Sequence, residues 1–69
     1  MPSGTHPSLD AFRMREIEQQ LTAELQRARE RLLRARTEEE TRSAVRLRNR
    51  ALQRLTDFVA RKIVPKEFL

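Results

Sequence analysis

The chain has 69 residues, no cysteine, one histidine and a formal net charge of +5 at neutral pH. A chain of this length forms one small domain at most, and it buries only about 60% of the surface that its unfolded form exposes. The composition excludes a disulfide framework and thiolate metal sites, and a single imidazole cannot assemble a metal site or an ordinary acid–base relay. Association with another chain is therefore the expected source of the missing stability.

The first eight residues differ in composition from the rest. They contain two of the three prolines, the only glycine and the only histidine. They lack the charged start and apolar run of a signal peptide, and no apolar segment of the chain approaches the length of about 18 residues that spans a membrane. We expect residues 1–8 to be a flexible tail and the protein to be soluble and intracellular.

Residues 9–64 contain neither proline nor glycine and are rich in the residues that favour helix. Ser8 is the expected N-cap, with Asp10 in the first turn, and Pro65 is the expected stop. In the first half, apolar residues recur at steps of three and four and form one stripe, which consists of Met14, Ile17, Leu21, Leu25, Ala28, Leu32 and Ala35.

The apolar stripe changes direction between the two halves. In the second half it is broader, and its centre lies about 150° from the first stripe at 100° per residue. Between the halves, "RTEEETR" places Thr37 three residues before Glu40, the pattern of a capping box. We therefore predict a helix over residues 9–36, a turn near residue 37, a helix over residues 38–64 and an apolar C-terminal tail over residues 65–69. The alternative is one long helix with Thr37 and the glutamates on its solvated surface.

The predicted fold is all-α: an antiparallel, coiled-coil-like hairpin that completes a helical bundle with another chain. Folding back near residue 37 places Leu21 near Leu55 and Leu32 near Ala44, so apolar residues face each other. The apolar face of the second helix is wider than one partner helix can cover, and the apolar residues of the C-terminal segment are not expected to pack within the hairpin. The expected partner-facing residues are Phe12, Leu21, Leu25, Leu32, Arg48, Leu52, Leu55, Phe58, Val59, Ile63, Phe68 and Leu69.

The stretch "VRLRNRALQR" contains two kinds of arginine. The first kind forms a stripe directed away from the apolar face, with possible phosphate contacts at Arg42, Arg46, Arg50, Arg54 and Arg61. Acids approach this stripe only at its ends, through Glu38 and Asp57 at a spacing of four residues. Arg48 instead falls within the apolar face. It either pairs with a carboxylate, from Glu24 or from a second chain, or lays its stem on the apolar surface with its charge in water.

No feature of the sequence indicates an enzyme or a cofactor site, because there is no glycine-rich phosphate loop and no positioned nucleophile or base. The predicted function is a small protein-interaction or assembly subunit that packs against itself or a partner helix. The alternative is binding of RNA or DNA backbones by the arginine stripe, although no tyrosine or tryptophan offers a stacking platform. A helix lying on a membrane surface is less favoured, because glutamates are spread through the first helix and no tryptophan anchors an interface.

Overall fold

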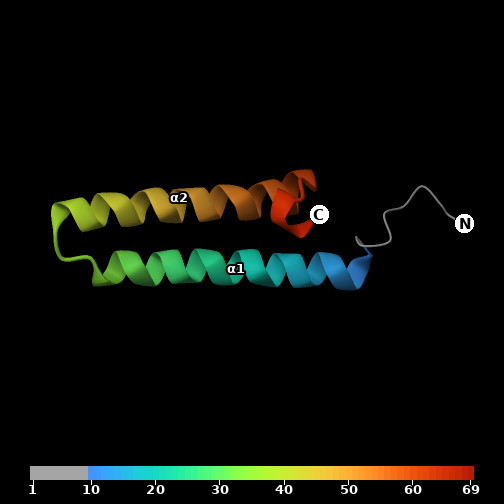
Figure 1. Cartoon of the computed structure of the whole chain (residues 1–69), viewed down its shortest axis with the longest axis horizontal. Coiled ribbons are helices and arrows are strands. Elements are labelled where there is room, and N and C mark those ends of the chain that lie inside the picture. The colour runs from blue at the N-terminus through green and yellow to red at the C-terminus, as the bar shows by residue number, and fades with distance from the viewer. Residues whose placement is uncertain (1–9) are drawn as a thin grey trace, which may run out of the picture.

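The computed structural model describes residues 10–69. They form two α-helices of 24 residues each, α1 (Ala11–Arg34) and α2 (Glu38–Arg61), followed by the short 3₁₀-helix η2 (Lys66–Phe68). α1 and α2 run antiparallel, side by side, and pack against each other (Figure 1). The predicted all-α antiparallel hairpin is confirmed, and the alternative of one long helix is wrong.

Helix α1 begins at a cap supplied by its own sequence. The Oδ1 atom of Asp10 accepts a hydrogen bond from the backbone amide of Arg13 at 2.8 Å. An aspartate in this position satisfies an otherwise unpaired amide and places a negative charge at the positive end of the helix dipole. Asp10 is therefore the cap itself, not a residue of the first turn. The predicted cap, Ser8, and the predicted first helical residue, Leu9, lie outside the described residues.

The turn between the helices confirms the predicted capping box. The amide of Glu40 donates to Oγ1 of Thr37 at 3.0 Å, and Oε1 of Glu40 accepts from the amide of Thr37 at 3.3 Å. The same carboxylate oxygen also accepts from the amide of Arg36 at 2.9 Å. α1 ends two residues earlier than predicted because Ala35 is already extended. The box holds the turn without glycine or proline, since the glutamate satisfies amides that would otherwise lack a partner.

Helix α2 ends at Arg61, three residues before the predicted end at residue 64. Lys62 has φ 60° and ψ 30°, a left-handed conformation that ends the helix, and the amides of Lys62 and Ile63 donate to the carbonyls of Phe58 and Asp57, each at 3.1 Å. The left-handed residue turns the chain back, so that η2 lies beside the open end of the hairpin (Figure 1). Pro65 does not end α2 but precedes η2.

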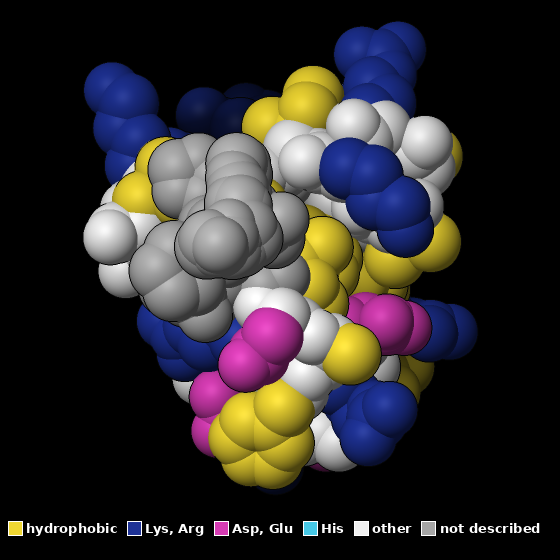
Figure 2. All heavy atoms as spheres, turned by 90° about the vertical axis from the view of Figure 1, so that its right-hand side faces the viewer, with side chains coloured by type: hydrophobic (Ala, Val, Ile, Leu, Met, Phe, Trp, Pro, Cys, Tyr) yellow, Lys and Arg dark blue, Asp and Glu magenta, His cyan; other side chains and the backbone are white. Residues whose placement is uncertain are grey.

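The buried side chains differ between the two halves of the hairpin. At the open end Ile17, Leu21 and Phe58 form a cluster, and Met14, Leu55, Val64 and Phe68 pack against it. Toward the turn the buried residues are Ala28, Ala44 and Ala51. Seen from the open end, hydrophobic side chains lie in the middle of this face and also at its lower and right edges, and basic side chains lie around the outside (Figure 2). The prediction that the C-terminal segment is unused by the hairpin is wrong for Val64 and Phe68, because they cover this cluster.

Candidate interaction surfaces

Along α2 and just beyond its C-terminal end lie incompletely covered apolar residues, which we call the apolar flank: Val45, Leu52 and Val59 on α2, and Ile63, which follows the left-handed cap Lys62. The first three are seven residues apart and therefore lie on one side of the helix. Leu52, Val59 and Ile63 are 48%, 50% and 49% exposed, and Val45 is half-buried. The hairpin thus leaves several aliphatic side chains partly in contact with water.

The structure separates the twelve predicted partner-facing residues into three groups. Leu21 and Phe58 are buried within the hairpin, and Phe68 packs on the core of its own chain. A second group is half-buried and comprises Leu25, Leu32, Arg48 and Leu55. The exposed group comprises Phe12, Leu52, Val59, Ile63 and Leu69. Of the exposed residues, only Leu52, Val59 and Ile63 belong to the apolar flank.

Arg48 leaves α2 in nearly the same direction as Val45 and Leu52 of the apolar flank. The prediction that it pairs with Glu24 is wrong. Oε1 of Glu24 lies 3.0 Å from Nε of Arg54, six residues further along α2. Arg48 donates a hydrogen bond from Nη2 to Oδ1 of Asn49 at 3.0 Å. Within residues 10–69 no carboxylate lies within ion-pair distance of Arg48.

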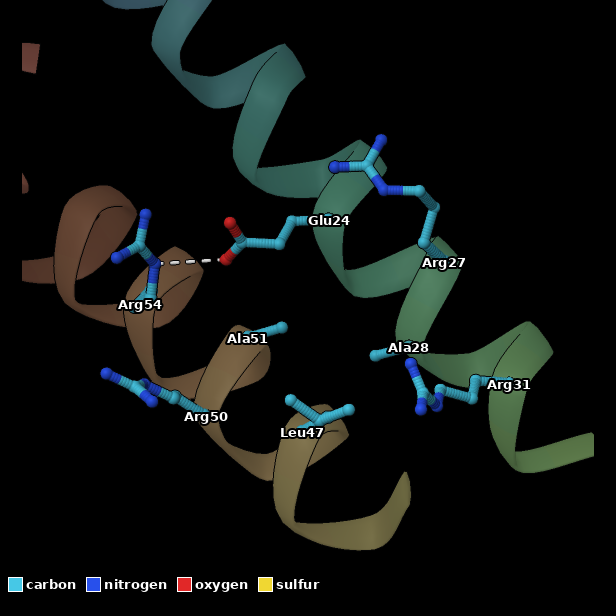
Figure 3. A pocket seen from close by; sticks show the side chains of 8 residues that line it. All are labelled: Glu24, Arg27, Ala28, Arg31, Leu47, Arg50, Ala51 and Arg54. Carbon is cyan, nitrogen blue, oxygen red and sulfur yellow. Dashed lines mark ion pairs between the residues drawn. The ribbon is translucent and has the colours of Figure 1, made fainter. Parts of the chain in front are cut away.

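A second surface, which we call the arginine groove, lies between the two helices and consists of two adjacent hollows of about 450 and 580 Å³. In the first, Arg27 and Arg31 rise from α1 and Arg50 and Arg54 from α2, with small or aliphatic side chains between them (Figure 3). The second hollow shares Arg31 with the first and extends toward the turn. Its lining includes Arg34, Ala35, Glu39, Glu40, Ser43 and Arg46.

The groove ends in an ion-pair cluster that joins three elements. Arg54 of α2 pairs with Glu24 of α1 through Nε and donates from Nη2 to Oε2 of Glu67 in η2. The contact to Glu24 has the distance of an ion pair but not the geometry of a hydrogen bond. The hydrogen bond from Arg54 lowers the pKa of the Glu67 carboxyl, and the same bond raises the pKa of the Arg54 guanidinium. Arg54 therefore acts within the chain as a link between α1, α2 and the C-terminal segment.

The predicted arginine stripe is only partly a free cationic surface. Arg42 pairs with Glu38 at 3.3 Å, as predicted, whereas Asp57 accepts a hydrogen bond from Gln53 at 2.8 Å and does not pair with Arg61. Arg46, Arg50 and Arg54 line the groove, and Arg54 is neutralised there.

The contribution of α1 to this basic surface was not predicted from the sequence. The missed groove residues are Arg27, Arg31 and Arg34. Their own spacing of four and three residues, which places them on one side of α1, was the signal that could have revealed them.

In residues 10–69 no cluster of three or more acidic or histidine side chains is placed to hold a metal ion. Within the same range, neither long helix carries an apolar stretch sufficient to cross a lipid bilayer. Comparison of this chain with protein-family models, with curated proteins and with solved structures finds no match.

Proposed function

We propose that this chain is a small, non-enzymatic assembly subunit that packs the apolar flank of α2 against a helix of another chain. The observation that carries the proposal is that Leu52 and Val59, on one side of α2, are each about half-exposed, as is Ile63 just beyond the end of the helix. Repeated apolar side chains on one side of a helix are the anchors by which helices dock on helices. A docked helix removes them from water.

The energetics of the hairpin support the same function. Complete burial of an aliphatic side chain contributes about 1.5–3 kcal/mol relative to full exposure, so each half-exposed member of the flank has about 1 kcal/mol still to gain. The hairpin alone has a small core, with only alanines buried in the half near the turn. Because this core is small, the unfolding free energy of the hairpin alone is expected to be small. Binding of a partner to the flank increases that unfolding free energy.

The chemistry of the partner follows from Arg48. A partner helix that offers apolar residues opposite Leu52 and Val59 and a carboxylate opposite Arg48 complements the flank. Such a pair adds little net stability, but it fixes the register in which two helices meet. The partner is a second copy of this chain or a helix of another protein.

The test is the mass of the purified chain in solution, measured by light scattering, together with its helix content by circular dichroism. We expect a helical dimer or tetramer if the partner is a second copy, and a poorly helical monomer if the partner is another protein. A stable, fully helical monomer would contradict the proposal, because it would show that the hairpin needs no cover.

Two matched substitutions distinguish loss of association through the flank from a general effect of adding a charge to the surface. Leu52→Asp places a charge in the apolar flank and is expected to shift the oligomer to monomer or to weaken partner binding at least about tenfold. Leu33→Asp is the matched control, because Leu33 is 86% exposed and lies outside the flank. Equal effects of the two substitutions would overturn the assignment of the flank as the interface.

A further inference from the structure

The arginine groove is separate from the apolar flank and has the charge of an anion-binding surface. Arg50 and Leu52 are two residues apart, so their side chains leave α2 about 160° apart, on opposite sides of the helix. The two hollows of the groove are lined by six arginines and three glutamates, which leaves a net charge of +3. A partner docked on the flank therefore leaves the groove open.

Most of the groove arginines make no ion pair within the described residues. Arg54 is paired with Glu24 and Glu67, and the carboxylate of Glu40 is occupied by backbone amides of the turn. The other five groove arginines make no ion pair in residues 10–69, which include all ten acidic residues of the chain. These five are Arg27, Arg31, Arg34, Arg46 and Arg50. All five are exposed.

The arrangement of these five arginines fits a ligand with repeated negative charges. Each helix forms one edge of the groove, which we call a rim. Arg27 and Arg31 are one turn apart on the α1 rim, and Arg46 and Arg50 are one turn apart on the α2 rim. Each rim therefore carries cations about 5–6 Å apart along the helix. A single free anion occupies one or two guanidinium groups and leaves the rest unmatched. A chain of phosphates can engage both rims, and guanidinium groups bind phosphate oxygens in bidentate fashion.

The residues between the rims indicate which parts of such a ligand the groove can contact. Ala28 and Ala51 are buried at the bottom of the first hollow, while Leu47, which is 40% exposed, is the largest apolar residue of the lining (Figure 3). No aromatic residue lines either hollow, so bases have no stacking platform there. An acidic partner helix would need a wider apolar floor for its own apolar residues than one leucine and three alanines provide.

From these observations we propose that the arginine groove binds the phosphodiester backbone of a nucleic acid, without reading its sequence. Five unpaired arginines correspond to at most about five phosphate contacts. The logarithm of the binding constant is then expected to fall with the logarithm of salt concentration by about 0.7 per contact for single strands and about 0.9 for duplex DNA.

The experiment compares two triple variants of the full chain with equal changes in net charge. The groove variant is Arg27→Gln, Arg31→Gln and Arg50→Gln. The control variant is Arg15→Gln, Arg29→Gln and Arg36→Gln, three exposed arginines that line neither hollow and make no ion pair in residues 10–69. Circular dichroism first verifies that both variants retain the helix content of the unmodified chain.

Binding is measured by fluorescence anisotropy with labelled oligonucleotides of about 20 nucleotides, single-stranded and duplex, over about 50 to 200 mM salt. The groove variant is expected to bind about a hundredfold more weakly at about 0.1 M salt. The slope of its salt dependence is expected to correspond to about two to three fewer phosphate contacts. The control is expected to lose less than about fivefold, since its three arginines line neither hollow and salt weakens their longer-range attraction for the ligand.

Three outcomes would overturn the proposal. The first is no binding of either oligonucleotide by the unmodified chain at about 50 mM salt. The second is an equal loss in both triple variants, which would show a response to net charge alone. The third is tighter, groove-dependent binding of poly-glutamate than of either oligonucleotide, which would assign the groove to an acidic protein.

Discussion

The open end of the hairpin and the half near the turn are held together by side chains of different size. At the open end Ile17, Leu21 and Phe58 are buried and the C-terminal segment covers them, whereas near the turn the helices meet through Ala28, Ala44 and Ala51. Large side chains bury more apolar area, so we expect the open end to contribute most of the stability. The alanine half instead leaves its larger side chains, Leu47 and Leu52, partly exposed.

The comparison teaches that the main core and the arginine groove are placed in different halves of the same small fold, whereas the apolar flank extends from Val45 near the turn to Val59 and Ile63 at the open end. The alanine half is where the arginine groove lies between the helices, and part of the apolar flank runs beside it. The alanines there are buried at the contact between the helices and bury less apolar area than the large side chains of the open end. The open end supplies the core that keeps the two helices together while these surfaces remain accessible.

The largest expected effect comes from the open end. Phe58→Ala removes a side chain that is 3% exposed and is expected to lower the free energy of unfolding by about 3–5 kcal/mol, enough to unfold most of a chain this small. Urea unfolding followed by circular dichroism measures the change. Leu33→Ala serves as the control and is expected to cost less than about 0.5 kcal/mol, because Leu33 is 86% exposed. Equal losses would show that the open end is not the dominant core.

The alanine half is expected to respond to added volume. Ala51 is 3% exposed, so Ala51→Leu has no space between the helices and is expected to cost about 1–3 kcal/mol through overpacking. The same substitution at Ala60, which is exposed on α2, is the control and is expected to have little effect. A gain in unfolding free energy for Ala51→Leu would mean that the alanine half has unfilled volume and would weaken the comparison.

The smallest effect concerns the contact that fixes the C-terminal segment to the open end. Arg54 lowers the pKa of Glu67, so the ionised carboxylate is favoured in the folded chain. The resulting stabilisation is complete above the ordinary pKa of a glutamate, about 4.3, and is lost as the pH falls through the lowered pKa of the folded state. The melting temperature is therefore expected to decrease modestly on acidification from about pH 5 to about pH 3.

Glu67→Gln isolates this contribution. At neutral pH the variant is expected to melt slightly lower than the unmodified chain, and its melting temperature is expected to change less between about pH 5 and pH 3. Glu18→Gln, at an exposed position without an ion pair in residues 10–69, is the matched control. Identical pH profiles for Glu67→Gln and the unmodified chain would show that the contact with Arg54 does not stabilise the fold.

The elements that depend on neighbouring residues could be predicted from the sequence. The two helices, the turn near residue 37 and the capping box of Thr37 with Glu40 all rest on interactions between residues three or four apart. The predicted positions of the helix ends were less accurate, because Ala35 and Lys62 leave the helical conformation although neither precedes a proline. A lysine in a left-handed cap has no distinctive sequence signal, since glycine is the usual residue there.

By itself the sequence determined that this chain is a helical hairpin with an apolar side on each helix and a surplus of arginine. Only the tertiary structure decided which arginines remain free, because this depends on how the two helices are rotated against each other. That rotation joins Glu24 to Arg54, directs Arg27 and Arg31 toward the side of Arg50, and leaves Arg48 without a carboxylate in residues 10–69. Periodicity gives the direction of side chains around one helix, whereas a groove between two helices requires their packing.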